Sequence, residues 1–127
     1  MRRGLVMMAL APLLWGCPKE QKAATVGWAD GRPVFDGDRG DCIVRASVAA
    51  IEPDGERRPI WSLELPMPID SENCSMRLPI VYGEPPAGVS AWPGDGPAPT
   101  LELGARYAFE ADGGYADHGA EFTGRGR

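Results

Sequence analysis

The chain has 127 residues, with 18 Asp or Glu against 13 Lys or Arg, so its formal net charge is −5. This length suffices for one domain with a modest core. The acidic balance argues against a nucleic-acid partner, because phosphates are bound through clustered Lys and Arg. The 17 Gly and 13 Pro approach the content of disordered chains, but four Trp, three Phe and three Tyr indicate a folded core.

The N-terminal segment has the pattern of a secretory signal. Arg2 and Arg3 give a positive start, and residues 5–14 are apolar throughout. This run suits the hydrophobic part of a signal peptide and is too short for a membrane-spanning helix, which needs about 20 residues. The A-x-A-like triplet of an ordinary cleavage site does not follow it.

Leu14, Trp15, Gly16 and Cys17 resemble the lipobox of bacterial lipoproteins, in which an aliphatic residue and two mostly small residues precede an invariant cysteine. Trp15 is bulkier than the residue usual at its position. The resemblance implies a signal peptide over residues 1–16, a diacylglycerol on the Cys17 sulfur and an acyl chain on the new amino terminus. Two or more such chains give stable membrane attachment. The alternative is an ordinary signal peptide, or an uncleaved apolar terminus with an incidental cysteine.

The resemblance also implies a location in the bacterial cell envelope. Removal of residues 1–16 leaves 111 residues, from 127 − 16, with 18 acids against 11 bases and a net charge of −7. In a Gram-negative host we expect the outer membrane, because Pro18 stands where an Asp would retain a lipoprotein at the inner membrane. Residues 78–107 further resemble the C-terminal half of small uncharacterised bacterial lipoproteins, a likeness that implies no activity.

The mature chain is expected to begin with a lipidated terminus and a flexible, polar tether over residues 17–24. A single β-sandwich domain is expected over residues 25–127. Its first segments, residues 25–28 and 32–35, are predicted to form either a first strand or an irregular lead-in.

The clearest strands form a predicted antiparallel hairpin. Residues 42–51 alternate, and one face of this strand is made by Cys42, Val44, Ala46, Val48 and Ala50. A Pro-Asp-Gly turn follows at residues 53–55. Residues 60–65 alternate again, with an inward face made by Trp61, Leu63 and Leu65.

Four more strands are expected toward the C-terminus, at residues 75–82, 89–92, 105–111 and within 115–123, where Phe122 is the expected core residue. Pro79 cannot donate to a sheet ladder, so its strand lies at an edge or contains a bulge. The mature chain has no convincing helical periodicity. Six to seven short strands predict an all-β fold, a small antiparallel β-sandwich.

The pattern Leu101-x-Leu103-Gly104-x-x-Tyr107-x-Phe109 resembles a strand-to-strand corner of fibronectin type III and related immunoglobulin-like domains. The resemblance implies that the Tyr107 hydroxyl is hydrogen-bonded to upstream backbone. Gly104 directly follows Leu103, without the proline common in that family. Any β-hairpin with a buried tyrosine is the alternative.

The number of cysteines predicts a disulfide. If Cys17 is lipidated, Cys42 and Cys74 remain as an even pair in an oxidising compartment. A bond between them would close a loop of 33 residues, from 74 − 42 + 1, and stabilise the fold by about 3–4 kcal/mol. Two free buried thiols are the alternative. The absence of a C-x-x-C motif argues against redox catalysis.

Three carboxylates, those of Asp36, Asp38 and Asp41, lie within six residues, and calcium favours such oxygen clusters. Counted from Asp36, however, the fifth, sixth and twelfth positions of an EF-hand loop hold Gly, Asp and Ser, so that motif fails. Arg39 would also oppose a cation. A Gly/Asp-rich turn is the favoured interpretation, and a calcium-stabilised surface or adhesion module is kept as the alternative.

The sequence does not predict an enzyme. His118 is the only histidine, and its place in a Gly-rich terminal segment is typical of a solvated side chain. With two distant cysteines it lacks the spacing of zinc ligands. Ser62 or Ser90 could be combined with it into a Ser-His-Asp set, but neither stands in a nucleophile elbow. We therefore assign no catalytic residue, metal site, cofactor or small-molecule substrate.

Three functions compete at this point. The preferred one is a non-catalytic, lipid-anchored envelope protein that binds a protein or glycan partner or has a structural role. Exposure of Trp28 or Trp92 would favour binding, and their burial would favour a scaffold. The others are the calcium-stabilised module and a small hydrolase that depends on His118.

Overall fold

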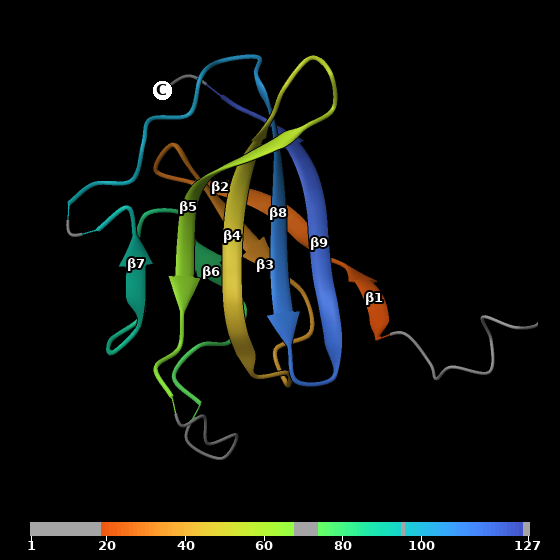
Figure 1. Ribbon diagram of the computed structural model, residues 1–127, viewed down its shortest axis with the longest axis vertical. Helices are drawn as coiled ribbons and strands as arrows, with labels where there is room; N and C mark the ends of the chain where they lie inside the picture. Colours follow the sequence, from red (N-terminus) through yellow and green to blue (C-terminus); the bar gives the residue numbers. More distant parts are fainter. Residues whose placement is uncertain (1–18, 68–73, 95, 126–127) are drawn as a thin grey trace, which may run out of the picture.

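The computed structural model describes residues 19–67, 74–94 and 96–125, and within these ranges the chain forms nine strands and no helix (Figure 1). The strands are β1 (Glu20–Ala23), β2 (Thr25–Ala29), β3 (Arg32–Asp36), β4 (Ile43–Ile51), β5 (Arg57–Glu64), β6 (Ile80–Val81), β7 (Ser90–Trp92), β8 (Arg106–Gly113) and β9 (Ala116–Thr123). The predicted all-β class is confirmed. The described residues hold more strands than the six to seven expected, because β1 is additional and residues 25–36 form two strands.

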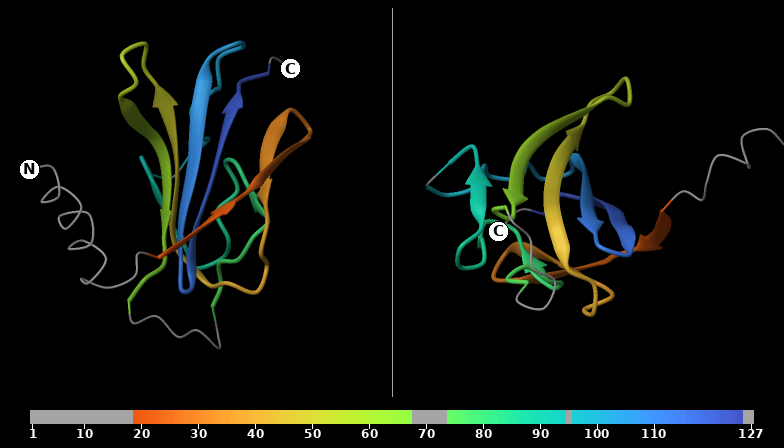
Figure 2. Two further views of the ribbon diagram at one scale, coloured as in Figure 1. Left: turned by 90° about the vertical axis from the view of Figure 1, so that its right-hand side faces the viewer. Right: turned by 60° about the horizontal axis from the view of Figure 1, so that its bottom comes forward.

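The strands form two sheets that pack as a small β-sandwich. One sheet has six strands in the order β1-β9-β8-β4-β5-β7, and the other has three in the order β2-β3-β6. All neighbours pair antiparallel except β1 and β9, which are parallel. Figure 2 shows the smaller sheet as a second layer beside the larger one.

Aromatic rings from both sheets fill the space between them. Phe35 of β3 stacks on Phe109 of β8, with ring centroids 4.1 Å apart. Phe122 of β9 is partly buried and packs against Phe35 and Tyr107. Trp61 of β5 and Tyr82 pack edge-to-face, with ring centroids 5.1 Å apart. Buried aromatic area of this kind dominates the stability of a small core.

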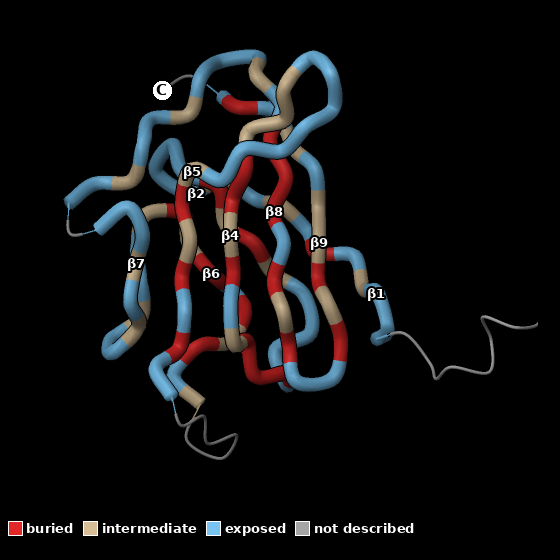
Figure 3. The backbone as a smooth tube through the Cα atoms, viewed as in Figure 1, coloured by how far each residue is buried: buried red, intermediate tan, exposed pale blue. Residues whose placement is uncertain are grey.

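The predicted inward faces of β5 and β8 are confirmed. Trp61, Leu63 and Leu65 are buried, and in β8 the buried Phe109 is followed by the exposed Glu110 (Figure 3). The predicted antiparallel pairing of β4 with β5 is also confirmed.

The predicted inner face of β4 is wrong at one position, Val44. Ile43, not Val44, is fully buried, because the pairing of β4 with β8 shifts register between Ile43 and Arg45. An extra residue in one strand reverses the alternation beyond it. From Ala46 onward the prediction is confirmed, because Val48 pairs with Phe109 and Ala50 packs, partly buried, against the same core.

Two shorter segments also differ from expectation. Only Ile80 and Val81 of the predicted strand 75–82 pair with a neighbour, and they form the edge strand β6 directly after Pro79. Glu20–Ala23, expected in the flexible tether, is strand β1 and pairs with β9 over four residues. Part of the segment expected to be a tether is therefore a strand.

The sandwich has two distinct ends. β5 and β8 both run antiparallel to β4, so they both end where β4 begins. We call this the lower end, as it lies in Figure 1; it holds the β3–β4 loop (residues 37–42) and the β8–β9 turn (residues 114–115). The upper end holds the β4–β5 turn (residues 52–56) and the segment 97–105.

Candidate functional site

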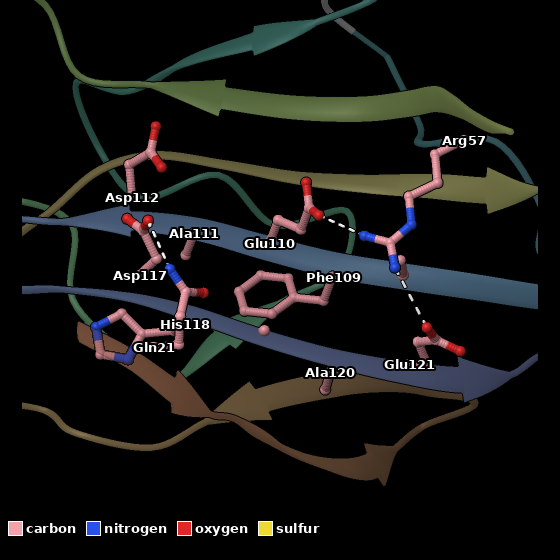
Figure 4. Close-up of a pocket in the computed structure, with 12 residues that line it drawn as sticks. Gln21, Arg57, Phe109, Glu110, Ala111, Asp112, Asp117, His118, Ala120 and Glu121 are labelled. Carbon is pink, nitrogen blue, oxygen red and sulfur yellow. Dashed lines mark hydrogen bonds and ion pairs between the residues drawn. The ribbon is translucent and has the colours of Figure 1, made fainter. Parts of the chain in front are cut away.

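Three features are candidate functional sites: a charged groove on the outer face of the large sheet, a buried Asp–His pair at the lower end, and a cleft at the upper end. The groove has a volume of ≈ 470 Å³ and crosses β8 and β9 (Figure 4). Arg57 bridges Glu110 and Glu121 across the strands, and Gln21 donates to Asp117 at 3.2 Å.

The charged groove is a poor candidate. Its ion-paired side chains are all well exposed, and exposed cross-strand ion pairs contribute little because water screens them. Its walls offer few apolar surfaces, whereas ligand pockets are mostly apolar with a few polar groups. We interpret the groove as the solvated face of the sheet.

At the lower end, Asp41 and His118 form a buried hydrogen-bonded pair. His118 Nε2 lies 2.9 Å from Asp41 Oδ2, and the two side chains are 0% and 1% exposed. The backbone N–H groups of Tyr115 and Ala116 donate to the same carboxylate at 3.0 and 3.1 Å. Asp41 comes from the β3–β4 loop and His118 from β9, so the pair joins segments 77 residues apart.

The hydrogen bonds to Asp41 decide its charge. Burial raises the pKa of its carboxyl, but the hydrogen bonds from His118 and from the Tyr115, Ala116 and Gly114 backbone outweigh burial and hold the pKa below its usual value. Asp41 is therefore ionised at neutral pH and acts as acceptor, and His118 Nε2 carries the proton that it donates.

Gly113 makes room for this arrangement. A Cβ atom at position 113 would lie 2.0 Å from Asp41 Oδ2 and 2.6 Å from the Ala116 carbonyl oxygen, distances that real Cβ atoms do not adopt. The carboxylate therefore occupies the space of a missing side chain. This explains why β8 ends with glycine.

The prediction that His118 is solvated is wrong, because the β8–β9 turn and the β3–β4 loop enclose it. A histidine and an ordered carboxylate resemble part of a catalytic triad. A general base must reach the proton that it removes, however, and this imidazole has no exposed surface. Ser62 lies on β5 and Ser90 on β7, and the hydrogen bond of the His118 ring goes to Asp41 instead. The pair is structural in this arrangement.

The three carboxylates of the β3–β4 segment do not converge. Asp36 accepts hydrogen bonds from Arg39 at 2.7 and 3.1 Å, and Asp38 accepts one from Lys22 at 2.8 Å. Asp41 turns inward to His118. Hydrogen bonds from these cations lower the pKa of Asp36 and of Asp38. Within the described ranges, no group of three or more His, Cys, Asp or Glu side chains is placed to hold a metal ion. The calcium alternative therefore gains no support here.

The cleft at the upper end has the size of a ligand site, ≈ 770 Å³. It lies between the β2–β3 turn, the residues after β6 and the segment 97–101. Its lining combines apolar Pro97, Ala98 and Leu101 with two cations, Arg32 and Arg125. Such a surface suits non-covalent recognition by apolar contact and a few hydrogen bonds.

Two tyrosines shape the upper end. The Tyr82 hydroxyl donates to the Pro99 carbonyl at 2.6 Å, and burial raises the pKa of this phenol, so it stays a donor. The Tyr107 hydroxyl accepts from the Glu102 N–H at 2.8 Å, the contact that the sequence resemblance implies. Leu103 of the same motif points into solvent and is 78% exposed. Tyr82 thus holds the wall of the cleft, and Tyr107 holds the corner beside it.

Two tryptophans were singled out from the sequence. Trp92 on the edge strand β7 is 53% exposed. Trp28 on β2 is partly buried, and the Arg125 guanidinium carbon lies 4.8 Å from its ring centroid. Exposure of either tryptophan was expected to favour a partner-binding role, and Trp92 is the exposed one.

The remaining predicted site residues are cysteines. Cys42 and Cys74 are joined by a disulfide, with Cα atoms 5.9 Å apart, as predicted. Cys17, the expected lipid attachment, lies outside the described residues, as do Leu14, Trp15 and Gly16. None of the described segments forms a helix long and apolar enough to cross a bilayer.

Sequence reasoning missed the cleft and the buried pair. Each is assembled from segments far apart in the chain, and the one local signal was the Gly-Gly turn that precedes His118 by a few residues. Comparison of the chain with protein-family models, with curated proteins and with solved structures finds no match.

Proposed function

We propose that the protein is a non-catalytic, lipid-anchored component of the bacterial cell envelope, attached through Cys17 and exposed outside the cytoplasm. The observation that carries this proposal is the Cys42–Cys74 disulfide. Such bonds persist in oxidising compartments and are rare in the cytosol. The lipobox resemblance of residues 14–17 supplies the anchor, and in a Gram-negative host Pro18 favours the outer membrane.

We infer further that the upper cleft is the binding surface, for an envelope protein or glycan. Its size, its apolar walls and its two arginines support recognition of a partner rather than chemistry. Arg32 is paired with Glu84 at 2.8 Å and Arg125 covers Trp28, so both cations are held in place at the rim. The enclosed Asp41–His118 pair supports a non-catalytic role, because it offers no accessible base.

The anchor is tested by the intact mass of protein extracted from membranes, with and without reductant. We expect the mass of residues 17–127 plus a diacylglycerol and a further acyl chain, with a gain of two hydrogens on reduction. An unacylated mass would refute the anchor, and an unchanged mass on reduction would refute the disulfide.

The cleft is tested by cross-linking in intact envelopes, with Cys17→Ser protein as the unanchored control. Ala98→Trp places a large side chain in the cleft and should abolish the cross-linked species. The matched control is Leu103→Trp, which adds the same ring at an exposed position on the same end and should leave cross-linking intact. Retention of the partner by folded Ala98→Trp protein would show that another surface binds.

A further inference from the structure

The position of β1 limits where an anchor at Cys17 can lie. Cys17 precedes the first described residue, Lys19, by two positions, so an extended chain separates their Cα atoms by at most about 7 Å. Glu20, the next residue, pairs with Ala116 at the beginning of β9. An acyl chain on Cys17 would therefore hold the bilayer close to the lower end of the sandwich.

Tyr115 is an exposed aromatic side chain close to this point. It directly precedes Ala116, and with strands about 4.8 Å apart its Cα lies within about 9 Å of that of Glu20. Its surface is 80% exposed. Tyrosine is enriched at membrane interfaces, where its ring contacts the acyl boundary and its hydroxyl stays hydrated.

A second exposed apolar side chain lies at the same end. Met67 follows β5, which ends beside the beginning of β4, and it too is 80% exposed. Of the four large hydrophobic side chains exposed in the described ranges, these two are at the lower end. Single exposed apolar residues are common on protein surfaces. These two, however, lie beside the proposed attachment point, where they could contact lipid.

Charges at the lower end are largely balanced. Lys19 pairs with Asp117 at 3.3 Å, and Lys22 pairs with Asp38 at 2.8 Å. Asp41 is enclosed with His118, and Asp36 is paired with Arg39. A chain of net charge −7 after removal of residues 1–16 would be repelled by anionic lipid. Pairing of these carboxylates with cations reduces that repulsion where the anchor enters.

We propose that the lower end of the sandwich rests on the bilayer that holds the Cys17 anchor, with Tyr115 at the level of the lipid headgroups. This inference depends on the proposed lipid anchor. It assigns a membrane-contact surface to the β8–β9 turn and directs the upper cleft away from the bilayer, toward the compartment that the protein faces.

The test compares two residues of equal exposure at opposite ends. The full chain is produced in a bacterium that processes residues 1–16, with the photoreactive residue p-benzoylphenylalanine at position 115 or at position 103. Tyr115 and Leu103 are 80% and 78% exposed, so neither replacement disturbs the core. Each protein is reconstituted in vesicles of phosphatidylethanolamine and phosphatidylglycerol and irradiated, and phospholipid adducts are counted by mass spectrometry together with the acylation of Cys17.

The expected result is an acylated protein with roughly five-fold or more lipid adduct at position 115 than at position 103. Acylated protein with equal adduct at both positions, or more at 103, would overturn the membrane orientation and leave the anchor standing. Protein without acyl chains would overturn the anchor, and the orientation with it. The two failures are therefore distinguished by the same spectra.

Discussion

The two ends of the sandwich are fixed by different kinds of interaction. The lower end contains a buried carboxylate with charge-assisted hydrogen bonds and the Cys42–Cys74 disulfide. The upper end contains neutral hydrogen bonds, one that the Tyr82 hydroxyl donates and one that the Tyr107 hydroxyl accepts, beside an open cleft. Bonds to an ionised group are about twice as strong as neutral ones.

This difference indicates where the fold can yield. Regions with few buried contacts and an exposed backbone have low local stability, and binding loops commonly lie in such regions. We expect the upper end to adjust to a partner while the lower end holds the sheets together. In the proposed orientation, the more stable lower end would contact the bilayer and the more adaptable upper end would contact the partner.

The largest effect on stability is expected from Asp41→Ala. The change removes the acceptor of His118 and of two backbone N–H groups and leaves them enclosed, so the free energy of unfolding should fall by about 3–5 kcal/mol. Urea unfolding of unlipidated Cys17→Ser protein, followed by circular dichroism, measures the loss. The control is Asp38→Ala in the same loop, whose exposed pair with Lys22 should matter little. Equal losses in the two variants would contradict a special role for Asp41.

Removal of the disulfide is the next largest change. Cys42→Ala with Cys74→Ala opens a closed loop of 33 residues, from a separation of 32 plus one, and should lower the free energy of unfolding by about 3–4 kcal/mol. Reductant should destabilise the parent protein by a similar amount and leave the double variant unchanged. A double variant that still responds to reductant would show that the effect is not due to this bond.

The pH dependence of stability should separate Asp41 from the exposed acids. Its pKa is lower in the folded protein than the usual 3.8, so its contribution is present above that value and is lost as pH falls through the folded pKa. Asp41→Asn cannot ionise, so its urea midpoint should decline less steeply than that of the parent below about pH 4. Asp36 and Asp38 keep their own acid dependence in both proteins. Parallel declines would show that the Asp41 carboxylate adds nothing to acid sensitivity.

The sequence predicts this fold best where strands alternate without interruption. Trp61, Leu63 and Leu65 were assigned correctly because a period of two follows from the pleat alone. Val44 was misplaced because a bulge depends on the partner strand, which a single segment does not reveal. β1 was missed because its strand state comes from backbone pairing with β9, and its polar side chains give no apolar pattern.

The site residues follow the same logic. The Cys42–Cys74 disulfide was predicted because an even number of cysteines remains in an oxidising compartment, an argument that needs no geometry. His118 was misjudged because its local sequence is that of a surface turn, and its burial depends on Asp41, 77 residues away. The cleft was not predicted at all, since three separate segments build it.

The smallest effect is expected at the upper end, from Tyr107→Phe. The variant keeps the buried ring and removes only the hydroxyl that accepts from the Glu102 N–H, so the free energy of unfolding should fall by about 0.5–1.5 kcal/mol. Glu102 is exposed, and water can replace the lost acceptor, which keeps the cost low. Tyr115→Phe, at an exposed position on the lower end, controls for the loss of a hydroxyl as such. A loss as large as that of Asp41→Ala would mean that the Tyr107 hydrogen bond contributes as much to stability as the buried Asp41–His118 pair.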